Sequence, residues 1–177
     1  FLGSFIQASS GFGYAIITMS LWPLFLPFKV AAIMELTSAI VMLLYISSKM
    51  FRHINFKMLL FPLIGSLITG AIGVYILLES QDALMKRIMG IALIFLAGYF
   101  ILSAKSFKIK ETKTNGLIAG GVSGLLGGLF NIGGPPIVGY FLAVTDDKRE
   151  YNSTLQCYFV LSTVYLFFIH LYMGNVT

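Results

Sequence analysis

Long apolar stretches separated by short charged segments form the dominant pattern of this chain. No Lys, Arg, Asp or Glu occurs in residues 1–28, 58–78, 88–104, 114–145 or 151–177, and residues 30–48 contain only Glu35. A transmembrane helix needs about 20 apolar residues, so the pattern predicts six membrane-crossing segments. Backbone groups in lipid need internal partners, and the strict alternation of a barrel strand is absent, which favours helices. We therefore expect an all-α, polytopic transmembrane bundle without a soluble domain.

Composition agrees with a lipid bilayer as the surrounding medium, because 58% of the residues are hydrophobic, 11% are charged and the mean hydropathy is +0.89. The net charge of +5 does not indicate nucleic acid as a partner, since the cations lie between the apolar stretches. Cys157 is the single cysteine, so we expect a buried thiol, with neither an internal disulfide nor a metal site built from cysteines. We expect no other metal site and no cofactor. The chain opens on FLGSFIQ without Met and stops just after an apolar stretch, so we expect truncation at both ends.

Basic residues concentrate in two of the short segments between the apolar stretches. Seven of the twelve cations lie there: Lys49, Arg52 and Lys57 in one, and Lys105, Lys108, Lys110 and Lys113 in the other. Loops rich in Lys and Arg stay on the cytoplasmic side of a membrane. We therefore expect residues 49–57 and 105–115 to be cytoplasmic, in a plasma membrane of the bacterial inner-membrane type.

The chain also carries a weak internal repeat with an offset of 120 residues. This offset aligns SSGFGYAII (9–17) with LFNIGGPPI (129–137), and it matches a broken apolar segment, a basic helix start, an apolar helix and an exit Asn in both halves. Transporters built from internal repeats show symmetry of this kind. We predict a first repeat at 1–104 with about four transmembrane segments, a basic linker at 105–115, and an incomplete second repeat at 116–177.

The glycine-rich segments allow two topologies. If 1–26 and 116–143 cross the membrane fully, each repeat has four spans and the halves are parallel. If these segments are re-entrant hairpins, each repeat has three spans and the halves are inverted. Charge alternation works without adjustment for full crossings, which we therefore expect.

The sequence GLLGGLFNIGGPPIVG (124–139) places six glycines and two prolines where an apolar helix should be strongest. A helix break in lipid must face protein or a water-filled cavity, because unpaired backbone groups are costly there. Pro is tolerated in the first turn of a helix, so Pro135 and Pro136 indicate the start of a half-helix. A helix N-terminus binds anions without a cationic side chain. We expect such a site here, with space for a side chain at Gly133 and Gly134.

Residues near both breaks are therefore candidates for binding a small anionic substrate: Ser9, Ser10, Gly11, Gly13, Asn131, Gly133, Gly134, Pro135 and Pro136. Gln7, Gln156 and Tyr158 are weaker candidates. The alternative is that small residues simply let helices approach closely. We favour this packing role for the residues spaced by four: Gly65, Thr69 and Gly73, and Gly120 and Gly124.

Glu35 is the only acidic residue inside an apolar segment. A carboxylate in the membrane is a functional candidate, here as a group that couples transport to protons. The alternative is that Glu35 reaches interfacial water.

The stretches GLIAGGVSGLLGGLFNIGGPPIVGYFL (116–142) and FRHINFKMLLFPLIGSLITGAIG (51–73), together with the duplicated halves, resemble the sulfite exporter TauE/SafE family. The first half has SGFGY where that family more often shows a run of glycines. The resemblance implies a broken helix opening each half and transport of sulfite, sulfonates or related organic anions.

No catalytic or nucleotide-binding motif is present in the sequence, so we do not expect an enzyme. We predict a secondary transporter that works by alternating access at apposed helix breaks. A passive anion channel and a structural membrane subunit without transport remain alternatives.

Overall fold

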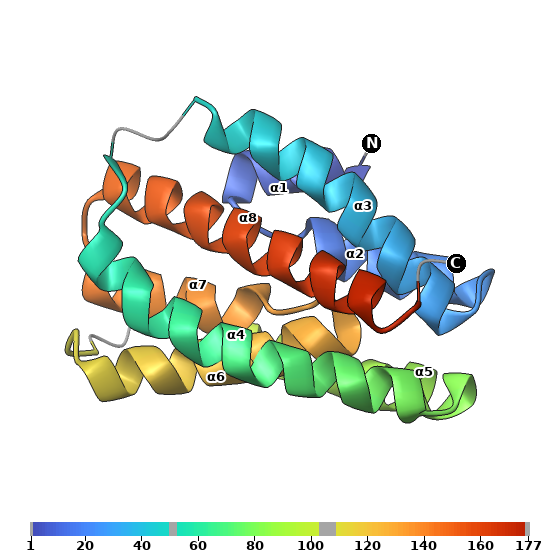
Figure 1. The fold of residues 1–177 in the computed structure, drawn as a ribbon. Helices are drawn as coiled ribbons and strands as arrows, with labels where there is room; N and C mark the ends of the chain where they lie inside the picture. Colours follow the sequence, from blue (N-terminus) through green and yellow to red (C-terminus); the bar gives the residue numbers. More distant parts are fainter. Residues whose placement is uncertain (1, 50–52, 103–108, 176–177) are drawn as a thin grey trace.

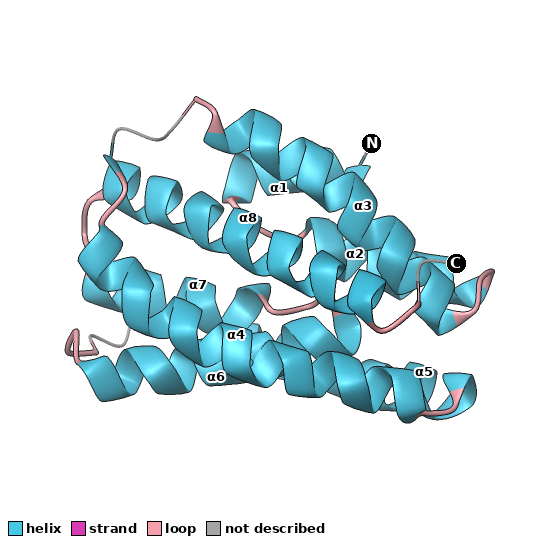
Figure 2. Cartoon of the chain, in the orientation of Figure 1, coloured by secondary structure: helices cyan, strands magenta, loops and turns pink. Residues whose placement is uncertain are grey.

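The computed structural model describes residues 2–49, 53–102 and 109–175. Within these ranges every regular element is a helix, as expected, and Figure 2 shows the helices joined by short loops. In chain order the elements are α1 (Leu2–Ser10), α2 (Tyr14–Leu21), the 3₁₀ helix η1 (Trp22–Leu24), α3 (Phe28–Ser47), α4 (Phe56–Glu79), α5 (Asp82–Leu102), α6 (Lys113–Phe130), α7 (Gly134–Val144) and α8 (Lys148–Tyr172).

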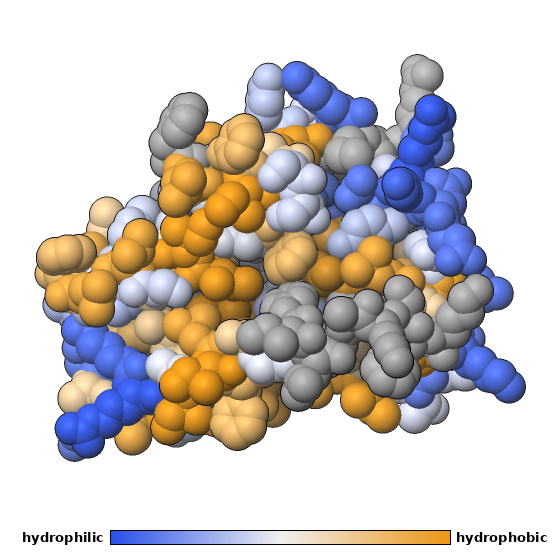
Figure 3. Space-filling view, turned by 180° about the vertical axis from the view of Figure 1, so that it is seen from behind, coloured by the Kyte–Doolittle hydropathy of each residue, from blue (hydrophilic) through white to orange (hydrophobic). Residues whose placement is uncertain are grey.

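The surface of the bundle is that of a membrane protein. Among the described residues, α3, α4 and α8 are long and apolar enough to cross a membrane, with mean hydropathies of 2.0, 2.0 and 1.5. Large apolar side chains point outward, such as Ile94 and Phe95 on α5, which are 74% and 75% exposed. Figure 3 shows an apolar middle with hydrophilic residues gathered toward the two ends. This arrangement matches lipid around the middle and water at both ends.

The long helices begin where the sequence supplies N-terminal caps. The side chain of Asn55 accepts a hydrogen bond from Met58 N at the start of α4, and Asp147 accepts from the backbone N–H groups of Arg149 and Glu150 at the start of α8. These caps satisfy amides that have no partner inside the helix. The hydrogen bonds from Arg149 N and Glu150 N lower the pKa of the Asp147 carboxyl below its ordinary value.

The second glycine-rich segment folds back on itself instead of crossing the membrane. α7 returns along α6, because Ser123 in α6 hydrogen-bonds to Gly133 O and the Tyr140 hydroxyl lies beside Gly116 near the start of α6. With 11 residues, α7 is about 16 Å long, roughly half of a hydrocarbon core. The expected full crossing of 116–143 is therefore wrong.

The first glycine-rich segment makes a similar hairpin. The Gln7 side chain in α1 accepts a hydrogen bond from Tyr14 N, and the backbone of Tyr14 lies beside Gly3. α1 and α2, with 9 and 8 residues, are each about 13 Å long or less. Full crossing of 1–26 is wrong as well. Charge counting missed this because the side of the loop at 145–150 changes with topology, and that loop mixes acidic and basic residues.

The two basic segments lie at the same end of the bundle. Asn55 N donates to Thr154 Oγ1 at 3.0 Å, and the Asn55 amide donates to Glu150, so the starts of α4 and α8 meet. In Figure 1 the loops before α4, α6 and α8 are all at the left. This agrees with a common side for the two basic segments, although Arg52, Lys105 and Lys108 lie outside the described residues. That this side is cytoplasmic stays a prediction. The opposite end joins α3 to α5 through a hydrogen bond from Phe28 N to Asp82.

α4 and α6 run parallel and pack through small residues. A side chain added at Gly120 would overlap the backbone of Pro62, one at Gly124 the backbone of Ser66, and one at Gly128 the backbone of Gly70. Gly65 and Gly73 meet the backbone of α6 in the same way, and the Thr69 hydroxyl donates to Gly121 O at 2.7 Å. The glycines expected to serve helix packing therefore lie at a helix contact.

Candidate functional site

Each hairpin turns at a short stretch of non-helical backbone. We call residues 11–13 the first break and residues 131–133 the second break. Gly11, Gly13 and Asn131 have positive φ angles of 84°, 112° and 60°. Gly adopts such angles without strain, and Asn tolerates the left-handed helical region better than most residues. A right-handed helix cannot continue through these residues, which is why α1 and α6 end there. Figure 2 shows both breaks as loops in the interior of the bundle.

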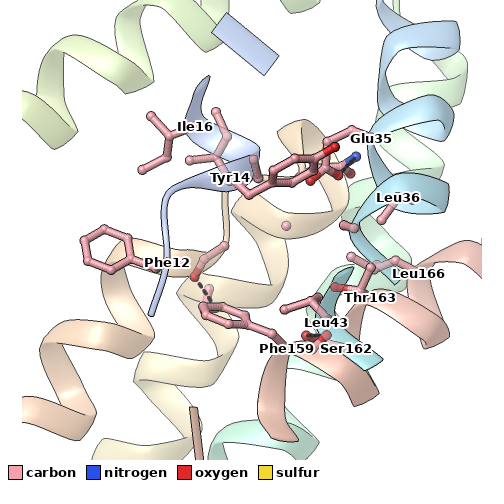
Figure 4. Close-up of a pocket in the computed structure, with 18 of the residues that line it drawn as sticks. Phe12, Tyr14, Ile16, Glu35, Leu36, Leu43, Phe159, Ser162, Thr163 and Leu166 are labelled. Atoms are coloured by element: carbon pink, nitrogen blue, oxygen red, sulfur yellow. Dashed lines mark hydrogen bonds between the residues drawn. The ribbon is translucent and has the colours of Figure 1, made fainter. Parts of the chain in front are cut away.

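One cavity lies between the two breaks. It contains about 650 Å³ of space free of protein atoms, including its open mouth, and is lined by Gln7 of α1 and by residues of α2, α3, α4, α6, α7 and α8. Gly13 from the first break and Asn131 and Gly133 from the second line it together. In Figure 4, Tyr14 reaches toward Glu35 on α3, and Phe159, Ser162 and Thr163 approach from α8. The cavity thus joins segments more than 100 residues apart.

The second break is held by its own side chain. Asn131 is 9% exposed, and its amide nitrogen donates to Ala32 O and to Glu35 Oε2, both at 2.8 Å. Its side-chain oxygen is buried without a hydrogen-bond partner. On the other side of this break, Tyr158 donates to the Ser123 hydroxyl at 2.8 Å, and Ser123 contacts the carbonyl of the break. The second break is therefore fixed to α3, α6 and α8.

The first break is held through its backbone. The carbonyl of Gly11 accepts hydrogen bonds from Gln7 Nε2 at 3.0 Å and from Gln156 Nε2 at 2.9 Å. Gln7 also accepts from Tyr14 N, so one side chain ties α1 to the start of α2. Gln156 comes from α8, which lies 145 residues away along the chain. In the sequence, Gln156 was a candidate only because it lies on a segment near the breaks, and nothing there indicated that it would bond to the Gly11 carbonyl.

Two helix N-termini face the cavity. Tyr14, Ala15 and Ile16 from the first turn of α2 line it, as does Gly134, the first residue of α7. A helix N-terminus carries partial positive charge and amides without acceptors inside the helix. No Lys or Arg is among the lining residues, and Glu35 is the one residue of the lining that can carry a full charge near neutral pH. Tyr14 N already donates to Gln7, and Pro135 and Pro136 have no N–H. What the two termini offer to the cavity is therefore their partial positive charge and the remaining amides, such as that of Gly134.

The structure brings most of the predicted site residues together. Gly13, Asn131, Gly133, Gly134 and Glu35 line the cavity. Gly11 supports the first break through its carbonyl, and Pro135 and Pro136 form the first turn of α7 without lining the cavity.

Two predicted residues lie elsewhere. Ser9 and Ser10 are exposed, and both hydroxyls donate to the carbonyl of Ile6 in the preceding turn of α1. Gly133 also differs from expectation, because a Cβ there would lie 2.6 Å from Ser123 O, whereas one at Gly134 would meet only side-chain atoms at 3.6 Å or more. Space for a side chain therefore exists at Gly134 and not at Gly133.

Within the described residues, no group of three or more His, Cys, Asp and Glu side chains could hold a metal ion.

Comparison with known proteins gives one match. The family model "Sulfite exporter TauE/SafE" matches residues 1–177. No curated protein and no solved structure matches the chain. The family match covers both hairpins, both breaks and the three membrane-spanning helices. The chain thus belongs to the TauE/SafE family of membrane transporters, a membership that implies transport of sulfite or related anions.

Proposed function

We propose that this protein is a secondary transporter that binds a small sulfur-containing oxyanion, sulfite or an organic sulfonate, in the cavity between the two breaks. The observation that carries the proposal is the meeting of two helix N-termini, those of α2 and α7, at one cavity inside a membrane bundle. Amides at such termini stabilise negative charge. A membrane transporter built from broken helices commonly places its substrate at this kind of junction.

The lining of the cavity suits an oxyanion with an organic part. Hydroxyls of Ser66, Ser123 and Ser162 lie on three different helices around the space. The Ser123 and Ser162 hydroxyls donate to the backbone carbonyls of Gly133 and Tyr158, so a hydrogen bond from either to an anionic oxygen would replace that contact. Apolar side chains, including Phe12 and Phe159, form other parts of the wall. These would contact the carbon substituent of a sulfonate, whereas sulfite would leave that space to water.

The hairpins offer a physical basis for alternating access. α2 leads to η1 and the start of α3, at the end of the bundle that contains Asp82. α7 leads to Thr145, at the opposite end, where Glu150 bonds both Thr145 and Asn55. A movement of either hairpin would thus open the shared cavity toward a different side. With no nucleotide-binding motif in the sequence, an ion gradient is the proposed source of energy.

The test is transport by the purified full-length protein in proteoliposomes, measured with ³⁵S-sulfite and with unlabelled sulfonates as competitors. Vesicles preloaded with sulfite should take up labelled sulfite faster than empty vesicles, because a carrier returns faster when it is loaded. Protein-free vesicles provide the control. An uptake rate that is the same with and without internal sulfite, together with a steady electrical current, would indicate a channel. Absence of both transport and binding for every sulfur oxyanion would contradict the proposal.

A further inference from the structure

We propose that Glu35 takes up a proton when the anion binds, so that the protein moves the anion and a proton in the same direction. This inference rests on the proposed function, because it assigns the coupling ion to the same cavity. It concerns a single pair of side chains, Glu35 and Asn131, which joins α3 to the second break.

Glu35 lies in a place where a charge is poorly compensated. It is the eighth residue of α3, about 10 Å along the helix axis from its start, and it is 2% exposed. Its carboxylate accepts a hydrogen bond from Asn131 and lines the cavity, which has no Lys or Arg in its lining. A buried carboxylate without a cation is costly in its charged form. In a membrane segment such a group is a functional candidate.

The other elements around Glu35 contribute no cationic side chain to the cavity. From α2, the Tyr14 ring points toward it and its hydroxyl donates to Ser38 at 2.6 Å. From α8, Tyr158 hydrogen-bonds to Ser123. α4 contributes Ser66 to the same cavity. η1 has the sequence WPL and carries no charge.

The charged residues of α5 lie near the start of α3 instead. Asp82 accepts from Phe28 N and pairs with Lys86 at 2.9 Å, in the first turns of α5. Lys29, in the first turn of α3, donates to Leu78 O. A proton is therefore the available means of neutralising Glu35 within the cavity.

Asn131 shows how that proton can be accommodated. In the structure its amide nitrogen has two acceptors, while its oxygen is buried with no donor. A protonated Glu35 has an O–H on the same carboxyl group that already faces the amide. Acid and amide can then form a pair with two hydrogen bonds, N–H to carboxyl oxygen and O–H to amide oxygen. Protonation thus supplies the one partner that the Asn131 side chain lacks.

The anion and the proton are linked because they share this cavity. A charged Glu35 repels an anion held at the breaks, and repulsion is strong where water is excluded. Binding of the anion therefore raises the proton affinity of Glu35, and protonation raises the affinity for the anion by the same factor. The proton carried by Glu35 and the bound anion would then cross the membrane together.

The main experiment compares wild type, Glu35→Gln and Glu35→Asp in proteoliposomes with ³⁵S-sulfite. Exchange is measured with equal sulfite and equal pH on both sides, and accumulation is measured with the outside more acidic. Wild type should do both. Glu35→Gln should still exchange sulfite but accumulate at least tenfold less under the pH gradient, and Glu35→Asp should recover part of the accumulation. Glu79→Gln, an exposed acid at the end of α4, is the matched control and should behave as wild type.

A second measurement uses wild type alone, so it does not depend on how a variant folds. Thiosulfate or methanesulfonate, whichever competes with sulfite, is added to the protein in weak buffer, because these anions do not themselves take up protons near neutral pH. Proton uptake on binding supports the proposal, and binding without proton uptake overturns it. Accumulation by Glu35→Gln equal to wild type also overturns it. If wild type neither exchanges nor binds sulfite or the competing anions, that result would instead contradict the proposed function.

Discussion

The two breaks begin alike and differ in chemistry. In each, a residue with positive φ ends the first helix of a hairpin, and a glycine follows two positions later: Gly11 and Gly13 in the first, Asn131 and Gly133 in the second. At the first break, the backbone carbonyl of Gly11 accepts hydrogen bonds from the side-chain amides of Gln7 and Gln156. At the second break, the amide side chain belongs to the break, because Asn131 donates a hydrogen bond to Ala32 O in α3. Two breaks that both begin at a residue with positive φ thus have different contacts: a backbone carbonyl held by amide side chains in the first, and a contact with the titratable Glu35 in the second.

The surroundings of the breaks sharpen this difference. The Asn131 side chain contacts residues 32 and 35 of α3. A Cβ at Gly11 would lie 3.3 Å from Asn152 Oδ1 and from Leu155 Cδ2, which are the positions 120 residues further along. This correspondence supports the predicted repeat. In the predicted repeat, Leu155 stands where the first half has Glu35, so the second half has no acidic group at this position.

The largest expected effect concerns the side of the membrane from which each hairpin enters. In a Cys157→Ser background, His53→Cys, Glu111→Cys and Lys148→Cys should all be protected from an impermeant thiol reagent added outside intact cells. Gln81→Cys, at the other end of the bundle, should be labelled. Labelling is all or none because the reagent does not cross the membrane. Reaction at Lys148→Cys alone would restore a full crossing for 116–143 and remove the hairpin from the comparison.

Gly133→Ala should be the most damaging single change at the second break. Its Cβ would lie 2.6 Å from the backbone oxygen of Ser123, which cannot move without shifting α6. We expect a loss of about 3 kcal/mol in the free energy of unfolding, typical of severe overpacking. Thermal unfolding of purified protein and the yield of monodisperse protein measure this. Gly134→Ala serves as the control, and wild-type stability of Gly133→Ala would show that the close contact is absent.

The anchors themselves should differ in strength. Asn131→Gly keeps the positive φ without strain but leaves Ala32 O and Glu35 without their donor, so we expect a loss of about 2 kcal/mol. Gln156→Leu should cost about 1 kcal/mol, because Gln7 still donates to Gly11 O. Thermal unfolding compares the two variants directly. Equal losses would mean that the breaks are anchored alike and that the contrast between them is not energetic.

Gly134→Ala should affect binding rather than folding. The added methyl group would meet Phe159 and Phe12 at 3.6 and 3.7 Å, which is ordinary contact, yet it would occupy the cavity at the start of α7. We expect tenfold weaker sulfite binding, a loss of about 1.4 kcal/mol, with unchanged thermal stability in the absence of ligand. Ligand-induced thermal stabilisation measures the affinity. Binding equal to wild type would place the anion away from α7.

The smallest effect is expected at the first break. Ser10→Ala removes a hydroxyl that is exposed and donates to the carbonyls of Ile6 and Phe12. Sulfite affinity should change less than about threefold, which corresponds to less than about 0.7 kcal/mol. A tenfold loss would indicate that Ser10 turns toward the substrate in another conformation.

The sequence predicted the features that depend on composition and local chemistry. Helices in a membrane, two basic segments at one end and a half-helix beginning near Pro135 follow from apolar length, charge and the Gly-Pro pattern, and α7 begins at Gly134. The direction in which α7 returns did not follow, because the loop at 145–150 has nearly balanced charges. The exposure of Ser10 depends on how a nine-residue helix docks, which its own residues do not specify.

Long-range partners were the other limit of prediction. Glu35 and Asn131 were each candidates, but their hydrogen bond joins residues 96 positions apart. Gln156 was a candidate only because it lies on a segment near the breaks, and its partner is the backbone carbonyl of Gly11 in the first break. A carbonyl has no sequence signature, so contacts of this kind emerge only from the folded arrangement.

The parallel contact between α4 and α6 limits how the molecule can move. α4 precedes the basic linker and α6 follows it, so this contact ties the two predicted repeats together. Backbone meets backbone at Gly120, Gly124 and Gly128 along the same line, and a sliding or tilting step would force carbonyls into one another. We therefore expect α4 and α6 to move as one unit. A change of access would then be a displacement of the hairpins, or of α3 and α8, relative to α4 and α6.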